Sequence, residues 1–506
     1  MTAARQSMDA RLAHGVAWTG GVKWAIQLLS WFVTLLTAKL LVPADYGYLA
    51  VLTVITRFML LITEGGVGAA IVNGPQLDDR QLRQLHSVSS LAGLGSFAVV
   101  LLISIPLSLY FHDGNVTSVL AVLGGTLVLE GLTIVPNARL KRQLDFRTTA
   151  MADGARSLTD LGVTLGLAAL GARYWSLVIG YSSGLLVWSA LIHAKSRVSF
   201  ERPEWTRLAP VLRFSRQLLG RNVSGFLAFS GDAPIGKLAM SRDALGLYTL
   251  AFTIAYAPAE KITQIILRVV PAILGNVRDS TSEVARYFLA VTSVVALVTF
   301  PMFAGIAFVA PDLVLVLLGE KWAPMVPVII PLCIYGAITE ALAMVSHVLQ
   351  AVGETRVLMR NGMLALLVMP LSFLVLSQSF GAPGLAAAWA VGTVILSVYP
   401  LRVACRRVGV TATQFLGTVG MPIVATGAML LLLFGIDTNP AVRDSSPLQR
   451  LLLHIAAGAL CYSITIYLLA RAKVQGLWTL GRSVLAARRL PTGRVVAASP
   501  RACVPE

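Results

Sequence analysis

Charged residues are scarce in this sequence. They make up 13% of its 506 positions, while hydrophobic residues make up 56%. A soluble globular protein carries about 25% charged residues. Apolar runs of roughly 20 residues, the length that crosses a bilayer core about 30 Å thick, recur along the chain. The composition excludes an ordinary soluble protein and predicts an all-α, polytopic membrane protein.

Cysteine is scarce as well, and motifs of catalytic chemistry are missing. The four cysteines are scattered without a C-x-x-C pair, which argues against a disulfide framework or a thiolate metal site and favours buried thiols. The segment GDAPIGKL at 231–238 resembles a phosphate-binding loop, but it ends in Leu where Mg²⁺ coordination needs a hydroxyl group. There is no H-E-x-x-H zinc-binding motif. We therefore expect no enzyme activity, no metal site and no cofactor.

The apolar runs predict fourteen membrane spans. The first is too long for the apolar core of a signal peptide, so it is interpreted as a retained span. Short connections join the spans, and the longest, about 194–216, is rich in arginine. The spans cover roughly 18–40, 47–73, 87–110, 116–137, 152–171, 174–193, 217–236, 245–272, 287–310, 325–351, 361–378, 383–401, 414–435 and 451–470.

Acidic residues are few beside basic ones, 24 against 41, which gives a net charge of +17. If successive loops alternate sides, 28 of the basic residues fall on the side of both termini and 7 on the other side. Basic loops mark the cytoplasmic face, so both termini are predicted to be cytoplasmic. This excess suits anionic lipid headgroups, and no nucleic-acid partner is expected.

A weak internal repeat suggests two related halves. PADYGYLAVLTVI in the second span is similar to RDALGLYTLAFTI in the eighth, which aligns Gly47 with Gly246. Two similar halves around a central site are common in transporters. The predicted division is an N-terminal segment 1–17, an N-lobe 18–195, a basic linker 196–216, a C-lobe 217–402, a final pair of spans 403–471 and a basic, disordered tail 472–506.

Ionisable residues inside the spans are the candidate site. A charge in a span costs several kcal/mol unless it faces water or a partner. Lys23 begins a polar stripe with Gln27, and Arg57 and Glu64, seven residues apart, share a helix face. A water-filled cavity between helices is favoured, with local pairing as the alternative.

The other charges within spans fall into a few groups. Asp153, Arg156 and Asp160 have the spacing of an intrahelical ion cluster, which could be purely structural. Further candidates are Arg221 and Asp232, expected on one face of the seventh span, Arg268, which aligns with Lys261, and the isolated Glu130 and Glu340. For the two isolated acids, a protonated carboxyl or a cross-helix hydrogen bond competes with a coupling-ion site.

Several segments resemble the polysaccharide-transporter (Wzx-type) branch of the MATE/MOP superfamily, which also holds the lipid II flippase. The more specific part is R-x-L-D-F-R followed by G-x-x-x-W-S-L-V. The segments are LVPADYGYLAVL, EGGVGAAIV, ARLKRQLDFRTTAMADGARSLTD, GARYWSLVIGYSSG, FSRQLLGRNVSGFLAFSGDAPIGKLAM, ALGLYTLAFTIAYAPAEKI and LGEKWAPMVPVIIPLCIYG. The resemblance implies two six-helix lobes around a V-shaped cavity and two extra C-terminal helices.

The resemblance also implies a function: export of undecaprenyl-diphosphate-linked oligosaccharide repeat units across a bacterial inner membrane. Such a substrate needs basic groups for its diphosphate, and guanidinium groups bind two phosphate oxygens at once. Lys23, Arg57 and Arg268 are the expected diphosphate ligands, followed by Arg221 and with Gln27 beside them. Membrane lipids and proteins of polysaccharide polymerisation and export are the expected partners.

Two other functions compete with this reading. A MATE-type cation-coupled drug exporter would share the fold and prefer a cavity for cations. An integral-membrane glycosyltransferase or polymerase needs a sizeable outside loop, whereas the outside loops here are short. Export would be driven by an ion gradient, by the membrane potential or by product removal, with Glu64, Glu130, Asp160 and Glu340 as coupling candidates.

Overall fold

A computed structural model describes residues 29–73, 77–267 and 270–487 of the chain. Helices are the regular elements of this described part, as predicted. A first helix covers Leu29–Leu40. The others are α2 (Pro43–Glu64), α3 (Val67–Asn73), α4 (Asp79–Phe111), α5 (Asn115–Arg142), α6 (Phe146–Ala169), α7 (Tyr174–Lys195), α8 (Trp205–Phe229), α9 (Asp232–Ala239), α10 (Arg242–Leu267), α11 (Val270–Val277), α12 (Thr281–Leu317), the 3₁₀ helix η1 (Glu320–Met325), α13 (Val326–Ala341), α14 (Ala343–Ala351), α15 (Thr355–Val408), α16 (Ala412–Asp437), α17 (Pro440–Arg443) and α18 (Pro447–Ala487).

Short polar side chains cap the starts of some of the long helices. Asp78 caps α4, because its carboxylate accepts a hydrogen bond from the Gln81 amide at 2.6 Å. Asp145 caps α6 in the same way, through the Thr148 amide at 3.0 Å. These carboxylates satisfy backbone donors that have no partner within the helix.

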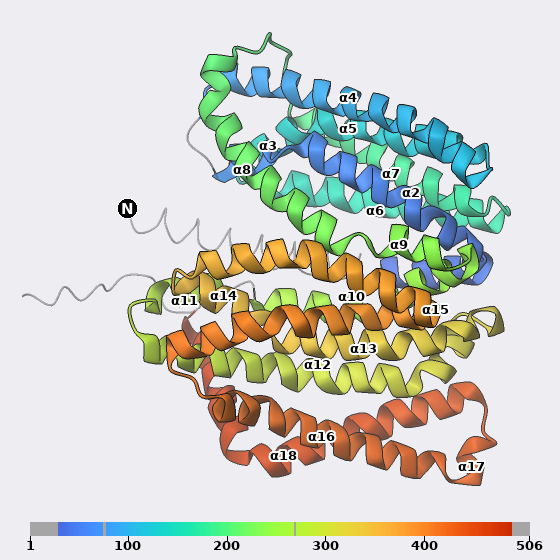
Figure 1. Ribbon diagram of the computed structural model, residues 1–506, viewed down its shortest axis with the longest axis vertical. Coiled ribbons are helices and arrows are strands. Elements are labelled where there is room, and N and C mark those ends of the chain that lie inside the picture. Colours follow the sequence, from blue (N-terminus) through green and yellow to red (C-terminus); the bar gives the residue numbers. More distant parts are fainter. Residues whose placement is uncertain (1–28, 74–76, 268–269, 488–506) are drawn as a thin grey trace, which may run out of the picture.

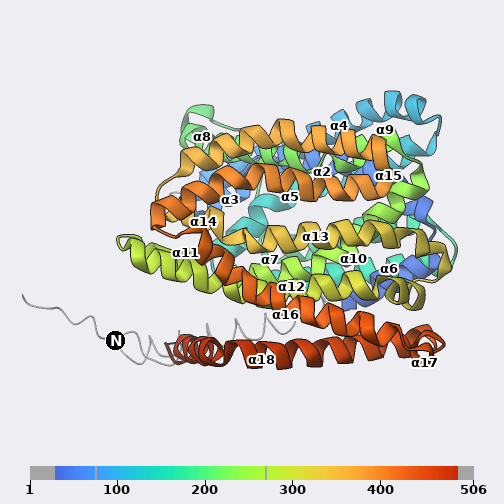
Figure 2. The same ribbon diagram turned by 60° about the horizontal axis from the view of Figure 1, so that its bottom comes forward.

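The helices form three layers (Figure 1). We call α2–α7 the N-terminal bundle and α10–α15 the C-terminal bundle, and α8 crosses from the first toward the second. The third layer is the pair α16 and α18, which lies along α12 (Figure 2). Arg450 of α18 fastens this pair through hydrogen bonds of 2.8 and 2.9 Å from its Nε to the buried carboxylate of Asp312.

Nine helices of the described part are long and apolar enough to cross a membrane. The fourteen-span count stays a prediction. One of the nine, α15, contains two helical segments that meet at Gly381, which lies between the predicted spans 361–378 and 383–401. Gly381 has φ 61° and ψ −138°, a conformation that favours glycine. Figure 2 shows the two segments side by side.

The boundary at the predicted linker differs from the one in the structure. Helix α8 begins at Trp205, inside the predicted linker 196–216, so the extended connection is only 196–204. The first turns of α8 carry Arg207, Arg213 and Arg216. These charges lower the hydropathy below that of a membrane span, which hid the helix start.

The two bundles touch where α2 crosses α10. A Cβ atom on Gly47 would lie 1.8 Å from the carbonyl oxygen of Arg242, and one on Gly246 would lie 1.8 Å from that of Pro43. Only glycine allows such an approach of two backbones. The two glycines that align in the weak sequence repeat therefore meet at the contact between the bundles.

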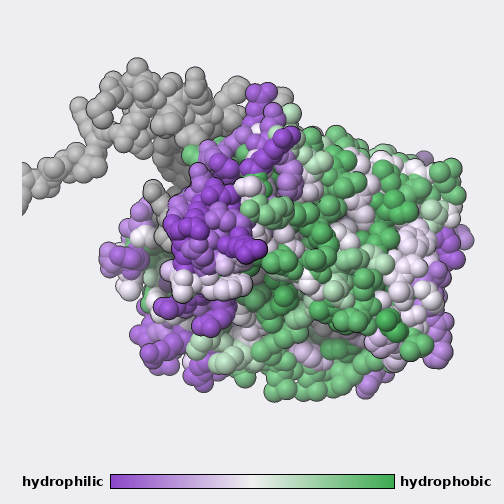
Figure 3. Space-filling view, turned by 90° about the horizontal axis from the view of Figure 1, so that it is seen from above, coloured by the Kyte–Doolittle hydropathy of each residue, from purple (hydrophilic) through white to green (hydrophobic). Residues whose placement is uncertain are grey.

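The two ends of the molecule differ in charge. The basic end carries the α3–α4 and α5–α6 connections and the 196–204 linker, and the crossing end carries the Gly47–Gly246 contact. Figure 3 shows hydrophobic side chains over the middle of one face and hydrophilic ones gathered at the two ends. This pattern fits a membrane protein with its lipid-facing band between two polar ends.

Candidate functional site

Two adjoining cavities lie among α2, α5 and α7. The smaller, about 180 Å³, is lined by Thr53, Thr56, Arg57, Glu130 and Tyr181, among others. The larger, about 420 Å³, is lined by Glu64, Glu130, Asn137, Lys141 and Trp188, among others. Glu130 stands on the wall of both. Charged and polar groups thus gather inside the N-terminal bundle. Helix faces in contact with lipid would not carry such groups.

Helical spacing places these side chains. Arg57 and Glu64 are seven residues apart on α2, which puts them on one face. On α5, Glu130, Asn137 and Lys141 follow at seven and four residues and form a second stripe facing the same space. The sequence predicted the first stripe, and the structure adds the second.

Arg156 of α6 contacts three residues that line the cavities. Its Nη1 lies 3.7 Å from Glu130 Oε1. Its guanidinium also lies 5.4 Å from the ring centre of Tyr181 and 5.5 Å from that of Trp188, within the range of cation–π attraction. Trp188 Nε1 in turn donates a hydrogen bond to Asp153 at 3.1 Å. These contacts hold Glu130 and both rings in place.

The charges of α6 therefore act between helices. The ion pair described for Arg156 crosses to α5 and does not join it to the carboxylates of its own helix, as the spacing had suggested. Asp160 instead accepts a hydrogen bond from the Thr164 hydroxyl at 3.2 Å. Glu130, predicted to stand alone in an apolar run, has Arg156 as its partner.

Two cations in the cavities stay available for an anion. Arg57 and Lys141 are both exposed. Within the described ranges, neither has a carboxylate oxygen closer than 4.0 Å, whereas Glu130 is already paired with Arg156. Glu64 is exposed on the wall of the larger cavity. Among the described residues, an incoming anion would meet two cations and one acid that form no ion pair with one another or with other side chains.

Three of the predicted residues lie elsewhere. Arg221 is exposed on α8, and α8 ends at Phe229, so Arg221 does not share a helix face with Asp232 at the start of α9. Asp232 accepts a hydrogen bond from the Tyr248 hydroxyl at 2.7 Å. Glu340 is buried in α13. None of the three lines the two cavities.

Three further predicted residues, Lys23, Gln27 and Arg268, lie outside the described residues. The structure adds Asn137, Lys141, Tyr181 and Trp188 to the site. Lys141 was assigned to a loop because hydropathy ends the predicted fourth span at residue 137, whereas α5 continues to Arg142. Among the residues described, no group of three His, Cys, Asp or Glu side chains could hold a metal ion.

Comparison with known proteins decides the family. The family model described as "Polysaccharide biosynthesis protein" matches residues 36–327, more than half of the chain. The chain belongs to this family. Curated proteins similar to this family member include the teichuronic acid biosynthesis protein TuaB of Bacillus subtilis, 23% identical over 93% of this chain and 97% of its own length. The lipopolysaccharide biosynthesis protein WzxC of Escherichia coli is 22% identical over 65% of this chain and 68% of its own.

Solved structures show the same fold. The lipid II flippase MurJ in an inward closed conformation superposes with a TM-score of 0.69, at 13% identity, over 90% of this chain and all of that one. An inward-facing multidrug transporter of the MATE family superposes with a TM-score of 0.57, at 14% identity, over 77% of this chain and 98% of that one. This family member therefore has the fold of the MOP superfamily and is a multi-pass membrane protein.

Proposed function

We propose that the protein is a flippase that moves undecaprenyl-diphosphate-linked oligosaccharide units across the bacterial inner membrane for the synthesis of a surface or secreted polysaccharide. The observation that carries the proposal is the charged cavity within a membrane bundle of a polysaccharide biosynthesis family member. The names of TuaB and WzxC, both from polysaccharide biosynthesis, and the MurJ-like fold support it.

The substrate chemistry matches the cavity. The diphosphate is the anionic part of such a lipid, and Arg57 and Lys141 are the unpaired cations of the site. The planar guanidinium of Arg57 can donate to two phosphate oxygens, while Lys141 acts as a point charge. Lys23, Gln27 and Arg268, which lie outside the described residues, remain proposed contributors.

The contacts between the bundles support an alternating-access mechanism. At the crossing end, Lys321 Nζ donates to the carbonyl oxygen of Leu41 at 2.7 Å, and Trp322 Nε1 donates to that of Ala38 at 3.0 Å. Arg242 of α10 lies 3.3 Å from Asp113 at the α4–α5 turn. We propose that these contacts close the outer side, that the basic end and both termini are cytoplasmic, and that transport breaks them.

Energy coupling needs a group that gains or loses charge. Glu64 and Glu130 in the cavity walls are our first candidates, followed by Asp160, Glu340, Asp232 and Asp153.

Polysaccharide polymerase and export proteins are proposed partners. The division into lobes at 18–195 and 217–402 is likewise a proposal.

The experiment compares a gene deletion in the host with complemented strains. Undecaprenyl-diphosphate oligosaccharide and finished polysaccharide are quantified in the deletion and after return of wild-type, Arg57→Ala or Arg213→Ala protein. Arg213 is an exposed arginine of α8 outside both cavities, so it is the matched control. We expect the lipid-linked unit to accumulate and the polymer to be lost in the deletion and with Arg57→Ala, but not with Arg213→Ala.

The alternative function gives the opposite result. A drug exporter of the MATE type would leave the polymer normal in the deletion and change tolerance to cationic dyes. That outcome would remove the flippase proposal. Equal rescue by Arg57→Ala and Arg213→Ala would keep the transport function and remove the cavity as its diphosphate site.

A further inference from the structure

A third cavity, of different character, lies on the surface of the N-terminal bundle at the basic end. It is a groove of about 520 Å³ between α4, α5 and the 196–204 linker. Its walls are mainly apolar side chains, and Arg202 stands among its lining residues. The lining includes Leu91, Leu94, Val128, Leu132, Phe200 and Arg202.

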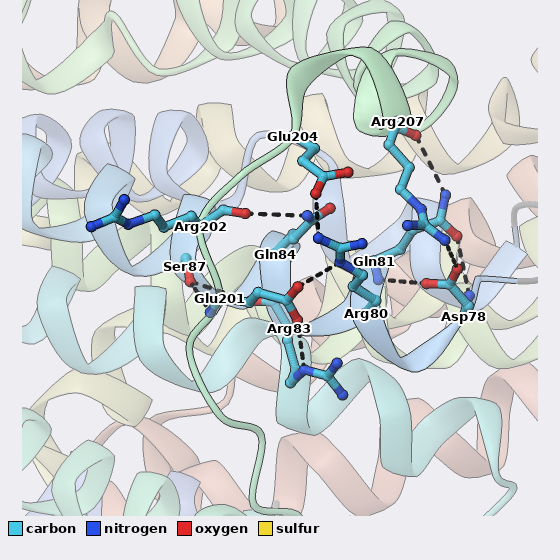
Figure 4. Close-up of polar contacts among 10 residues, drawn as sticks. All are labelled: Asp78, Arg80, Gln81, Arg83, Gln84, Ser87, Glu201, Arg202, Glu204 and Arg207. Atoms are coloured by element: carbon cyan, nitrogen blue, oxygen red, sulfur yellow. Dashed lines mark hydrogen bonds and ion pairs between the residues drawn. The ribbon is translucent and has the colours of Figure 1, made fainter.

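The linker beside this groove is held by ion pairs (Figure 4). Glu201 accepts from Arg80 Nε at 2.6 Å and from Arg83 Nε at 2.8 Å. Glu204 pairs with Arg80 as well, and Arg207 Nη2 lies 2.6 Å from Asp78. The arginines hold the pKa of the Glu201 carboxyl below its usual range. Both carboxylates of the linker are therefore occupied by arginines of α4.

Arg202 has a fixed backbone and an available side chain. Its carbonyl oxygen accepts a hydrogen bond from Gln84 Nε2 at 3.1 Å. Its guanidinium points away from the carboxylates of its neighbours in Figure 4, and it is exposed. Within the part of the chain that the structure describes, no carboxylate oxygen lies within 4.0 Å of it. The groove therefore has one positioned cation without a partner.

Exposed aromatic side chains flank Arg202 in the sequence. Phe200 and Trp205, on either side of Arg202 in the sequence, are each 63% exposed. On α4, Leu91 is 62% exposed and Leu94 53%. Aromatic side chains gather where a bilayer meets water, and arginine attracts anionic headgroups there. The apolar walls lie on the hydrocarbon side of that level and the arginine on the polar side.

We infer that this groove binds an anionic glycerophospholipid of the leaflet at the basic end. Its acyl chains lie along Leu91, Leu94, Val128 and Leu132, and its phosphate is held by Arg202. Charge complementarity decides the occupant: Glu201 also lines the groove but is neutralised by two arginines of α4, whereas Arg202 has no carboxylate partner among the described residues. The inference does not depend on the transported substrate. If the basic end is cytoplasmic, the lipid belongs to the inner leaflet.

The test measures lipid retention by the full-length protein. The purified protein in detergent is mixed with phosphatidylglycerol or with phosphatidylcholine of the same acyl chains, and bound lipid is read by native mass spectrometry. Losing a charge-assisted contact should reduce phosphatidylglycerol retention about tenfold in Arg202→Gln. Arg213→Gln should retain it like the wild type, because this equally exposed arginine does not line the groove.

A second pair of variants tests the apolar walls. Leu94→Trp fills the groove and should reduce retention, whereas Leu102→Trp, at a 69% exposed position of the same helix, should not. All four side chains are exposed, so folding is expected to survive, and a thermal melt in detergent checks this.

Three results would overturn the inference. One is equal retention in Arg202→Gln and Arg213→Gln, which would indicate diffuse attraction to the basic end. Another is equal binding of phosphatidylcholine. The third is displacement of phosphatidylglycerol by undecaprenyl phosphate at equal concentration, which would assign the groove to a polyprenyl lipid. None of them bears on Arg57, so the flippase proposal stands or falls separately.

Discussion

The interiors of the two bundles have opposite chemistry, although a weak sequence repeat relates them. The N-terminal bundle holds two cavities, of about 180 and 420 Å³, whose lining includes Arg57, Lys141 and Glu64. The C-terminal bundle is filled by aromatic rings, with Trp389 lying 5.2 Å from Tyr335 and 5.5 Å from Phe252, measured between ring centres. The cavities of the N-terminal bundle can therefore receive an anion, whereas the aromatic cluster described in the C-terminal bundle offers no charged lining.

Two half-buried acids, Glu130 in the N-terminal bundle and Asp232 beside the C-terminal bundle, differ in the same way. In the C-terminal bundle, Trp389 Nε1 donates to the Tyr248 hydroxyl at 2.7 Å, and this hydroxyl donates to Asp232 at 2.7 Å. A chain of hydrogen bonds thus satisfies the carboxylate with neutral donors. In the N-terminal bundle, Glu130 is held by the charged Arg156. The difference suggests that the N-terminal bundle recognises the charge of the substrate. The C-terminal bundle would then be the rigid body relative to which the N-terminal bundle moves.

The largest effect is expected from reversing the cavity charge. Arg57→Glu should lower export at least tenfold, because a charge-assisted contact to phosphate, worth about 1.5 to 3 kcal/mol, becomes a repulsion. Lipid-linked unit and polymer are quantified in cells. Arg221→Glu makes the same change at an exposed position outside both cavities and should export normally. Equal loss in the two variants would show that net charge, and not this site, matters.

The next largest effect is expected on the unfolding free energy, through a hydrogen-bonded tyrosine of the C-terminal bundle. Tyr248→Phe removes the donor to Asp232 and the acceptor of Trp389, which should cost about 1 to 3 kcal/mol of unfolding free energy. Denaturant titration in mixed micelles measures it. Tyr110→Phe, at a 62% exposed ring, is the control. Export per folded molecule should stay normal, and a specific loss of export would give the aromatic bundle a direct role in the substrate path.

A smaller effect is expected for the ion pair between α5 and α6. Glu130→Gln keeps the side-chain volume and removes one charge. Partly exposed pairs contribute about 0.2 to 1 kcal/mol, so the free energy of unfolding should fall by no more than this amount, and a loss of export beyond about fivefold would mark Glu130 as a coupling residue. A double-mutant cycle with Arg156→Gln measures the coupling between the two residues. If the cycle shows no coupling, the contact does not hold the cavity wall.

The smallest effect concerns pH at the linker, outside both bundles. Capping and Arg207 hold the pKa of Asp78 below its usual range, and Arg80 and Arg83 do so for Glu201. Their stabilisation is complete above the unfolded pKa values and is lost as pH falls through the lower folded ones. The melting temperature should be level from pH 8 to about 5 and decline below about pH 4. Asp78→Asn with Glu201→Gln should flatten that decline.

Sequence reasoning succeeded where a single helix carries the information. Spacing along α2 placed Arg57 and Glu64 on one face, and both line the cavities. It failed where two helices meet. The partner of Arg156 is on α5, and the spacing within α6 could suggest only its own carboxylates. Lys141 was missed because hydropathy ends a span before the helix ends, and Arg202 because an extended linker has no periodicity to read.

The backbone contact between Gly47 and Gly246 also constrains how the protein is made. The two glycines are separated by 199 residues. At about 5 to 20 residues per second, the ribosome needs about 10 to 40 seconds to reach the second after the first. During that interval the N-terminal bundle has to stay in the bilayer with its charged cavity and without its partner. The Glu130–Arg156 pair, formed within that bundle, is complete before the crossing can exist. Assembly in this chain is thus ordered in time, with the charged half first and the closing half second.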